Sequence, residues 1–360
     1  MKEKSNDYLI MDAGTYSCKV GFSSEETPTV CSPVIYGYPI AQVGQNPIFN
    51  YYGSEVNQHS SSLNIKEIYE SGTQFPIKLL EGFWQNLFLS QFELESLPHP
   101  IIISQPMSLS PHRKEKLCEL FFETFDAPAF LIVPSPMAGI FSSGRISGIV
   151  VDCGHSFTSV TSITDGTPFA CASEYQLFGG REITNYIQTN LRCSRNTARK
   201  IKEDVDFEEL EMNESEQKKL FSNFLLPDGT SFSQVKKVYD QAYEGLFKPD
   251  CIGLGKPGLH EVLFSSILKN DSDFRRELIG NVIIGGGNSC FPNFNERFNR
   301  EISQMLPNIQ KVKIFSQKNQ NNMVYTGCSV LSLLNSFSSQ MMTKEEFDEN
   351  GASFINSKTI

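Results

Sequence analysis

The sequence lacks the features that identify most metal-binding, secreted and membrane-spanning proteins. None of its nine cysteines forms a Cys-x-x-Cys pair, and its five histidines show no zinc-ligand spacing to them. The cysteine count is odd and the spacings are wide, which indicates reduced intracellular thiols rather than a disulfide framework. We expect no signal peptide in the N-terminal segment MKEKSNDYLIMD, and no apolar run is long enough to span a bilayer.

Positive charge is also scarce. The chain has 31 Lys and Arg against 41 Asp and Glu, which gives a formal net charge of -10. Because such a protein repels nucleic-acid phosphates, no direct DNA or RNA binding is expected. The hydrophobic fraction of 39% and the charged fraction of 20% are ordinary for a globular protein, and 360 residues suffice for two domains or one bilobed fold.

Two short apolar strands end in the same pattern, Asp-x-Gly. Leu9–Met11 leads into Asp12–Ala13–Gly14, and Ile149–Val151 leads into Asp152–Cys153–Gly154. Each turn is followed by a segment suited to a returning strand. The repetition predicts a duplicated core with one copy in each lobe, and two unrelated hairpins are the alternative.

The chemistry of these turns suits phosphate. Glycine lets backbone N–H groups converge on an anion, and two carboxylates can hold the hydration shell of a magnesium ion beside the phosphates. Lys19 alternates with Cys18 and Val20, so it can point back at the phosphates. The residues alone do not favour that interpretation over an ordinary surface lysine.

A third glycine-rich strand end follows Val282–Ile284. Gly285–Gly287 separates this strand from a helix that we expect to open at Pro292. A helix N-terminus favours a negative group, although a glycine triplet is also typical of a tight crossover. Strands alternate with helices in both halves, which predicts an α/β fold. The buried stripe of the last helix is expected to consist of Phe294, Phe298, Ile302 and Met305.

Taken in order, these motifs resemble actin, from Tyr8 to nearly the C-terminus. The resemblance is carried by DAGTYSCKVGFSSEETPTVCSPVIYGYP, LFGGREITNYI, IGLGKPGLHE, DFRRELIGNVIIGGGNSCFPNFNERFNREI and TKEEFDENGASFI, among other blocks. It implies an actin-like ATPase fold of class α/β, with two duplicated lobes and four subdomains around a central nucleotide cleft. The expected small (outer) domain is 1–142 plus 323–360, with a subdomain-two excursion near 33–70, and the large (inner) domain is 143–322.

The resemblance also implies ATP or ADP with Mg²⁺ (or Ca²⁺), the metal being held through water by Asp12 and Asp152. Lys202 and Glu203 would contact the adenosine, with Glu203 on the ribose. The alternative is that both side chains belong to a solvent-exposed helical face of the charged stretch 194–219. The full set implied for the nucleotide is Asp12, Gly14, Thr15, Lys19, Asp152, Gly154, Thr158, Arg199, Lys202, Glu203, Gly286, Gly287 and Phe291.

Several positions depart from actin. Ser135 and Ser159 stand where actin has the glutamine and histidine that position the attacking water. Phosphoryl transfer to water depends on an oriented nucleophile, so the catalytic residues are unknown and hydrolysis is expected to be weak or absent. Tyr16 and His155 add bulk to the two turns.

Three functions fit this pattern. The first is a nucleotide-bound actin-related protein, which acts as a cytoskeletal or complex-associated interaction subunit. The second is a divergent filament-forming actin with ATPase activity. The third is a small-molecule kinase that shares the duplicated core, for which no base beyond Asp152 is evident.

Expected partners are actin, other actin-related subunits and actin-binding proteins. Part of actin's partner-binding cleft is retained at Phe141, Gly166, Leu331, Leu334 and Ser336. The expected location is the cytoplasm, with the nucleus as the alternative.

Overall fold

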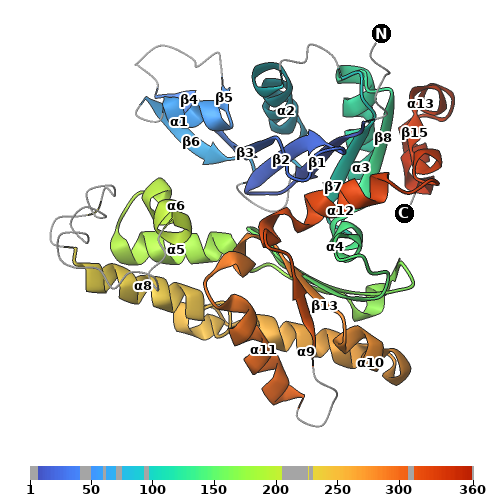
Figure 1. Cartoon of the computed structure of the whole chain (residues 1–360). Coiled ribbons are helices and arrows are strands. Elements are labelled where there is room, and N and C mark those ends of the chain that lie inside the picture. Colours follow the sequence, from blue (N-terminus) through green and yellow to red (C-terminus); the bar gives the residue numbers. More distant parts are fainter. Residues whose placement is uncertain are drawn as a thin grey trace. The chain divides into compact units, whose positions relative to one another are not determined.

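The chain divides into two compact units. Unit 1 comprises Met1–Ile146 and Asn322–Ile360, and unit 2 comprises Ser147–Asn321. The computed structural model (Figure 1) describes residues 7–40, 50–59, 62–69, 75–92, 97–204, 226, 230–306 and 312–358. Parts of the excursion expected near 33–70, and of the charged stretch 194–219, lie outside the described residues. No described helix is long and apolar enough to cross a membrane.

Unit 1 is built on a six-stranded sheet in the order β15-β8-β7-β1-β2-β3. The strands β1, β7 and β8 are parallel, whereas β2 and β3 are antiparallel to their neighbours. The strand bounds are β1 (Leu9–Ala13), β2 (Ser17–Phe22), β3 (Val30–Pro33), β7 (Ile101–Gln105), β8 (Ala129–Pro134) and β15 (Met342–Thr343).

Alternation along β1 separates two environments in unit 1. Leu9 and Met11 join a hydrophobic cluster with Trp84 of α2 (Ile77–Gln91) and Leu117 of α3 (Pro111–Glu119). The helices α4 (Ser135–Ser142) and α12 (Met323–Ser332) contact each other and the strand β7. Because strand side chains alternate between faces, Asp12 points away from the cluster that contains Met11.

A smaller sheet and the helices α1 and α13 also belong to unit 1. The small sheet has the order β5-β4-β6. Its strands and the remaining helices are β4 (Ile35–Pro39), β5 (Tyr51–Tyr52), β6 (Leu63–Glu67), α1 (Ser54–Gln58) and α13 (Lys344–Asn350).

Unit 2 repeats the arrangement of the first sheet. Its sheet has the order β11-β10-β9-β13-β14, and β12 also pairs with β10. The strands β9, β13 and β14 are parallel, and β10 is antiparallel to β9. The strands are β9 (Gly148–Cys153), β10 (Thr158–Thr164), β11 (Thr167–Pro168), β12 (Glu174–Gln176), β13 (Val282–Gly285) and β14 (Ile314–Ser316).

The two sheets have the same connectivity around the Asp-x-Gly turns. In each, the strand before the turn pairs with an antiparallel returning strand on one side and with a parallel strand on the other. Asp12 lies opposite Lys19 and Asp152 opposite Ser159, so the register of the two hairpins is identical. The predicted duplication is therefore confirmed.

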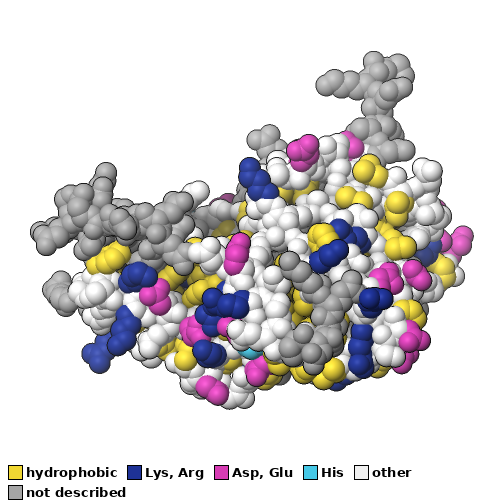
Figure 2. All heavy atoms as spheres, turned by 60° about the horizontal axis from the view of Figure 1, so that its bottom comes forward, with side chains coloured by type: hydrophobic (Ala, Val, Ile, Leu, Met, Phe, Trp, Pro, Cys, Tyr) yellow, Lys and Arg dark blue, Asp and Glu magenta, His cyan; other side chains and the backbone are white. Residues whose placement is uncertain are grey.

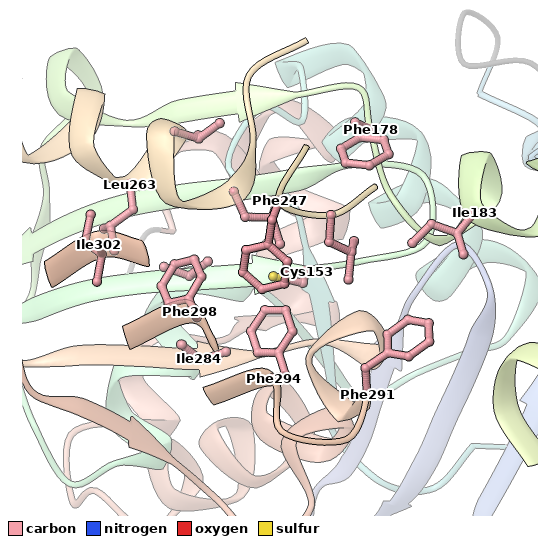
Figure 3. Packing of buried hydrophobic residues seen from close by; sticks show 14 of the residues in the cluster. Cys153, Phe178, Ile183, Phe247, Leu263, Ile284, Phe291, Phe294, Phe298 and Ile302 are labelled. Atoms are coloured by element: carbon pink, nitrogen blue, oxygen red, sulfur yellow. The ribbon is translucent and has the colours of Figure 1, made fainter. Parts of the chain in front are cut away.

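The helices of unit 2 enclose an aromatic-rich core. Phe247, Phe294 and Phe298 pack close to Cys153 and Ile284 (Figure 3), and the rings of Phe294 and Phe298 are stacked with centroids 5.7 Å apart. The helices are α5 (Gly180–Leu191), α6 (Arg195–Asp204), α8 (Phe232–Glu244), α9 (Leu259–Lys269), α10 (Ser272–Ile279) and α11 (Phe294–Met305).

The start of α11 differs from the sequence prediction. A 3₁₀ turn at Gly287–Cys290 follows the glycines, and α11 begins at Phe294 rather than at Pro292. The reason is local, because Asn293 adopts the left-handed conformation with φ 54°, which cannot lie inside a right-handed helix. Three residues of the predicted stripe are buried, whereas Met305 is only half-buried.

The contact between α4 and α12 supplies a test of packing in unit 1. A Cβ atom added to Gly327 would overlap the carbonyl oxygen of Ala138. We expect Gly327→Ala to lower the free energy of unfolding by about 1–3 kcal/mol, because the two backbones would have to separate. Urea unfolding measures this. Gly255→Ala is the control, since a Cβ atom there meets nothing within 4 Å, and equal effects of the two substitutions would contradict the packing account.

Candidate functional site

The first turn connects β1 to β2 with Gly14 at its start. A Cβ atom on Gly14 would lie 2.8 Å from the carbonyl oxygen of Ser17. Only glycine fits such a close backbone approach without displacement. Thr15 and Tyr16 complete the turn, and the Tyr16 carbonyl accepts a hydrogen bond from the Val34 amide at 2.8 Å. The sequence therefore dictates a tight turn directly after Asp12.

The carboxylate of Asp12 is buried and held at both oxygens. Lys19 Nζ donates to Oδ2 at 2.9 Å, and Ser104 Oγ donates to Oδ1 at 2.9 Å. Asp12 and Lys19 are each 8% exposed. Lys19 is thus not an ordinary surface lysine. It points to the same face of the sheet as Asp12 because the two residues are directly opposed across β1 and β2.

Sequence reasoning missed Ser104. It lies at the end of β7, where its hydroxyl also accepts a hydrogen bond from the Ala13 amide at 3.2 Å. Ser104 therefore fixes both the carboxylate of Asp12 and the backbone of the turn. A signal was available, because a polar residue followed a buried strand and parallel neighbouring strands end at the same edge of a sheet.

The second turn has a matching construction. A Cβ atom on Gly154 would lie 2.9 Å from the carbonyl oxygen of Phe157, which accepts a hydrogen bond from the Gly154 amide at 3.1 Å. The first residues of α5 form hydrogen bonds with this turn. The amides of Gly180 and Arg181 donate to the carbonyls of Gly154 and His155 at 3.1 and 2.8 Å. These hydrogen bonds hold the turn in place within unit 2 and require no ligand.

The glycine triplet has two different roles. Gly286 has φ 89°, and a Cβ atom there would lie 2.5 Å from the Cys153 carbonyl oxygen and 2.7 Å from Asp152 Oδ1. This glycine is required because the chain's own backbone approaches so closely, as in a tight crossover. A Cβ atom on Gly287 meets nothing within 4 Å. The space beside the triplet is thus at Gly287.

The residues expected at the nucleoside lie together on unit 2. Lys202 Nζ donates to Thr184 Oγ1 at 3.1 Å and to the Gly180 carbonyl at 3.4 Å, and it lies 3.6 Å from Glu203 Oε1. The Lys202 side chain is only 8% exposed, so it is not part of a solvated face, whereas the Glu203 side chain is 39% exposed. Arg199 lies on the same helix, α6. These contacts anchor α6 to the start of α5.

Two further residues of the implied set lie deep in unit 2. Phe291 is 9% exposed, and its ring centroid lies 5.1 Å from that of Tyr243. Thr158 is 1% exposed, and its hydroxyl donates to the Phe178 carbonyl at 2.9 Å. The hydroxyl of Thr158 therefore serves the internal structure of unit 2.

Buried thiols accompany both aspartates. Burial raises the pKa of Cys328, and the negative charge of Asp12 raises it further. Burial likewise raises the pKa of Cys153, with Asp152 as the next cause. These thiols stay protonated at neutral pH. The carboxylates therefore supply the negative charge at each strand end.

Ser135 and Ser159, which the resemblance places at the water-positioning sites of actin, lie in different units. Ser135 is the first residue of α4, directly after β8. Ser159 lies opposite Asp152 in the hairpin of unit 2. The described residues contain no group of three or more His, Cys, Asp and Glu arranged to hold a metal ion directly.

We expect the buried pair of Asp12 and Lys19 to stabilise unit 1. Lys19→Met should lower the free energy of unfolding by about 3–5 kcal/mol, because it leaves a buried carboxylate without its cation. Asp12→Asn combined with Lys19→Met should cost less than the two single effects together. Urea unfolding of the double-mutant cycle measures the coupling.

The control for this cycle is an exposed pair. Lys236 and Asp240 are one helical turn apart, and their side chains are 41% and 55% exposed. Lys236→Met should change the free energy of unfolding by less than about 1 kcal/mol. Equal effects of Lys19→Met and Lys236→Met would contradict the assignment of a buried ion pair to unit 1.

Comparison with protein families gives a match over nearly the whole chain. Residues 3–198 and residues 190–360 match the family model described as Actin.

Proposed function

Because the chain belongs to the actin family, we propose that it binds ATP or ADP and acts as an actin-related structural subunit with weak or absent hydrolysis. The observation that carries this proposal is the repeated turn. Each unit places a carboxylate at the end of a strand and a glycine two residues later, in identical register. Each of these turns is suited to contacting phosphate.

The residues present fit the proposed ligand. Gly14, Lys19 and Gly154 would contact the phosphates, and Lys202, Glu203 and the other residues implied on unit 2 would contact the nucleoside. The open space at Gly287 leaves room for a ligand beside the triplet. Thr158 is proposed to act through its backbone, because its hydroxyl is already bonded to Phe178.

A divalent cation is proposed to bind through water to Asp12 and Asp152. Mg²⁺ keeps several of its waters, so carboxylates that accept hydrogen bonds from water suit it better than a dedicated cage. Asp12 remains able to accept such bonds, since each carboxylate oxygen has two acceptor sites and only one bond to each is occupied by Lys19 or Ser104. The cation would neutralise phosphate charge.

Slow hydrolysis follows from the serines at positions 135 and 159. Attack by water on the terminal phosphate requires a water held in line, because positioning supplies most of the catalysis. The serine hydroxyl is shorter than the glutamine amide and the histidine ring of actin, so it holds that water less firmly. ATP would then act as a bound structural ligand rather than as a substrate for hydrolysis.

The proposed partners are proteins. On unit 1, Leu333 and Leu334, directly after α12, are 75% and 46% exposed and offer adjacent apolar side chains to a partner. Leu331, expected to belong to the partner-binding cleft, is 1% exposed because it packs inward from α12. The proposed contact on this unit therefore involves Leu333 and Leu334. Family membership favours actin, actin-related subunits or actin-binding proteins, in the cytoplasm or alternatively the nucleus.

Surface charge is mixed on the face shown in Figure 2. Lys and Arg side chains are interspersed with Asp and Glu among hydrophobic residues. A mixed surface suits specific protein contacts more than attraction to a polyanion.

The second candidate is a divergent filament-forming actin with ATPase activity. Retention of Asp12, Lys19 and Asp152 supports it. The resemblance to actin places Ile252–Leu254 in the apolar plug between filament strands, which also supports this candidate. Ile252 and Leu254 pack partly buried against the unit 2 core. Pelleting with magnesium and ATP distinguishes the two candidates, because a stable filament fraction would favour this one.

Hydrolysis is tested by a gain of function. In single-turnover assays, we expect the wild-type protein to release phosphate far more slowly than it binds ATP. Ser135→Gln combined with Ser159→His should accelerate release at least about tenfold, within the range that positioned groups contribute. Each single substitution is the control for the other. Rapid hydrolysis by the wild-type protein on assembly would contradict the proposal.

A further inference from the structure

Asn288 connects three chain segments of unit 2. It follows the glycine triplet on the 3₁₀ turn Gly287–Cys290 and is 4% exposed. Its Nδ2 donates to the Gly154 carbonyl at 2.7 Å. The carboxamide therefore joins the glycine triplet to the second Asp-x-Gly turn, 134 residues away in the sequence.

The other end of the carboxamide lies against the start of α5. A Cβ atom on Gly180 would lie 2.8 Å from Asn288 Oδ1 and 3.2 Å from Lys202 Nζ. Lys202 in turn donates toward the Gly180 carbonyl. The absence of a side chain at position 180 thus makes the space that the Asn288 carboxamide and the Lys202 ammonium share.

The bond to Gly154 does more than satisfy a backbone group. The Gly154 carbonyl already accepts a hydrogen bond from the Gly180 amide at 3.1 Å. Loss of Asn288 would therefore not leave this carbonyl without a partner, which limits the cost to folding. What would be lost is the constraint that fixes the turn relative to the glycine triplet and Lys202.

We propose that Asn288 is a positioning residue that couples the nucleoside-binding part of unit 2 to its phosphate-binding turn. This inference rests on the proposed nucleotide function. When Gly287 and Lys202 engage the nucleoside, the Asn288 carboxamide holds the turn after Asp152 in the orientation that the phosphates require. Asn288 thereby favours nucleotides with a polyphosphate chain over nucleoside monophosphates.

The test compares ATP with AMP in binding titrations of the full-length chain in the presence of magnesium. We expect Asn288→Ala to weaken ATP binding about 3- to 10-fold, the effect of one neutral hydrogen bond. AMP binding should change less than twofold, about the precision of such a comparison, because AMP has no β- or γ-phosphate for the turn to hold. Asn288→Leu keeps the branching at Cγ but removes the hydrogen-bonding groups, and it should behave in the same way.

Ser289→Ala is the matched control. Ser289 is 1% exposed on the same 3₁₀ turn, and its hydroxyl donates to the Gly286 carbonyl at 2.7 Å, within the triplet. Its loss should lower the melting temperature without changing the ratio of ATP to AMP affinity. Gly180→Ala tests the contact between Asn288 Oδ1 and the start of α5. Helix propensity favours Ala over Gly, so a selective loss of ATP affinity would report the displaced carboxamide.

The outcomes separate this inference from the proposed function. A wild-type protein that binds ATP, with a parallel loss of ATP and AMP affinity in the Asn288 variants, would overturn the role of Asn288 alone. A wild-type protein that does not bind ATP would overturn both. If Asn288→Ala does not fold, Asn288→Leu and Gly180→Ala decide by the same ratio.

Discussion

A carboxylate taken out of water has to be neutralised, and the buried aspartate at the end of β1 governs how unit 1 is built. Lys19 supplies the opposite charge from the next strand, and Ser104 supplies a hydroxyl from the strand on the other side. All three groups depend on the register of β1 with its two neighbours. A shift by one residue would turn the lysine to the opposite face of the sheet.

The corresponding aspartate of unit 2, Asp152, is half-buried and lies opposite Ser159. The strand beside Asp152 ends in glycines, and Gly286 lies against the Asp152 carboxylate so closely that a methyl group would collide with it. The turn that follows is fastened by the first amides of α5 and by Asn288. The two Asp-x-Gly turns therefore differ in their surroundings: Lys19 lies against Asp12, and the glycine loop lies against Asp152.

Local sequence was enough to predict the elements that depend on neighbouring residues. The two turns and their glycines were predicted from the tripeptides DAG and DCG. The α/β fold was predicted from the alternation of strands with helices. Ser104 and Asn288 could not be predicted in this way, because each acts on a partner that is distant in the sequence. The burial of Lys202 was also hidden, since its charged neighbours indicated a solvated helix. In the structure its side chain is 8% exposed and donates to Thr184 and Gly180 of α5. The start of α11 was misplaced because a left-handed Asn293 leaves no clear signal beside a proline.

We propose that ATP is a retained structural ligand of this actin-family protein. The nucleotide content of the freshly purified chain tests this most directly, by denaturing the protein and separating the released nucleotides chromatographically. The account predicts close to one adenine nucleotide per chain, with ATP persisting over hours in the presence of magnesium. A chain that is purified without nucleotide, and that takes none up from added ATP, would contradict it.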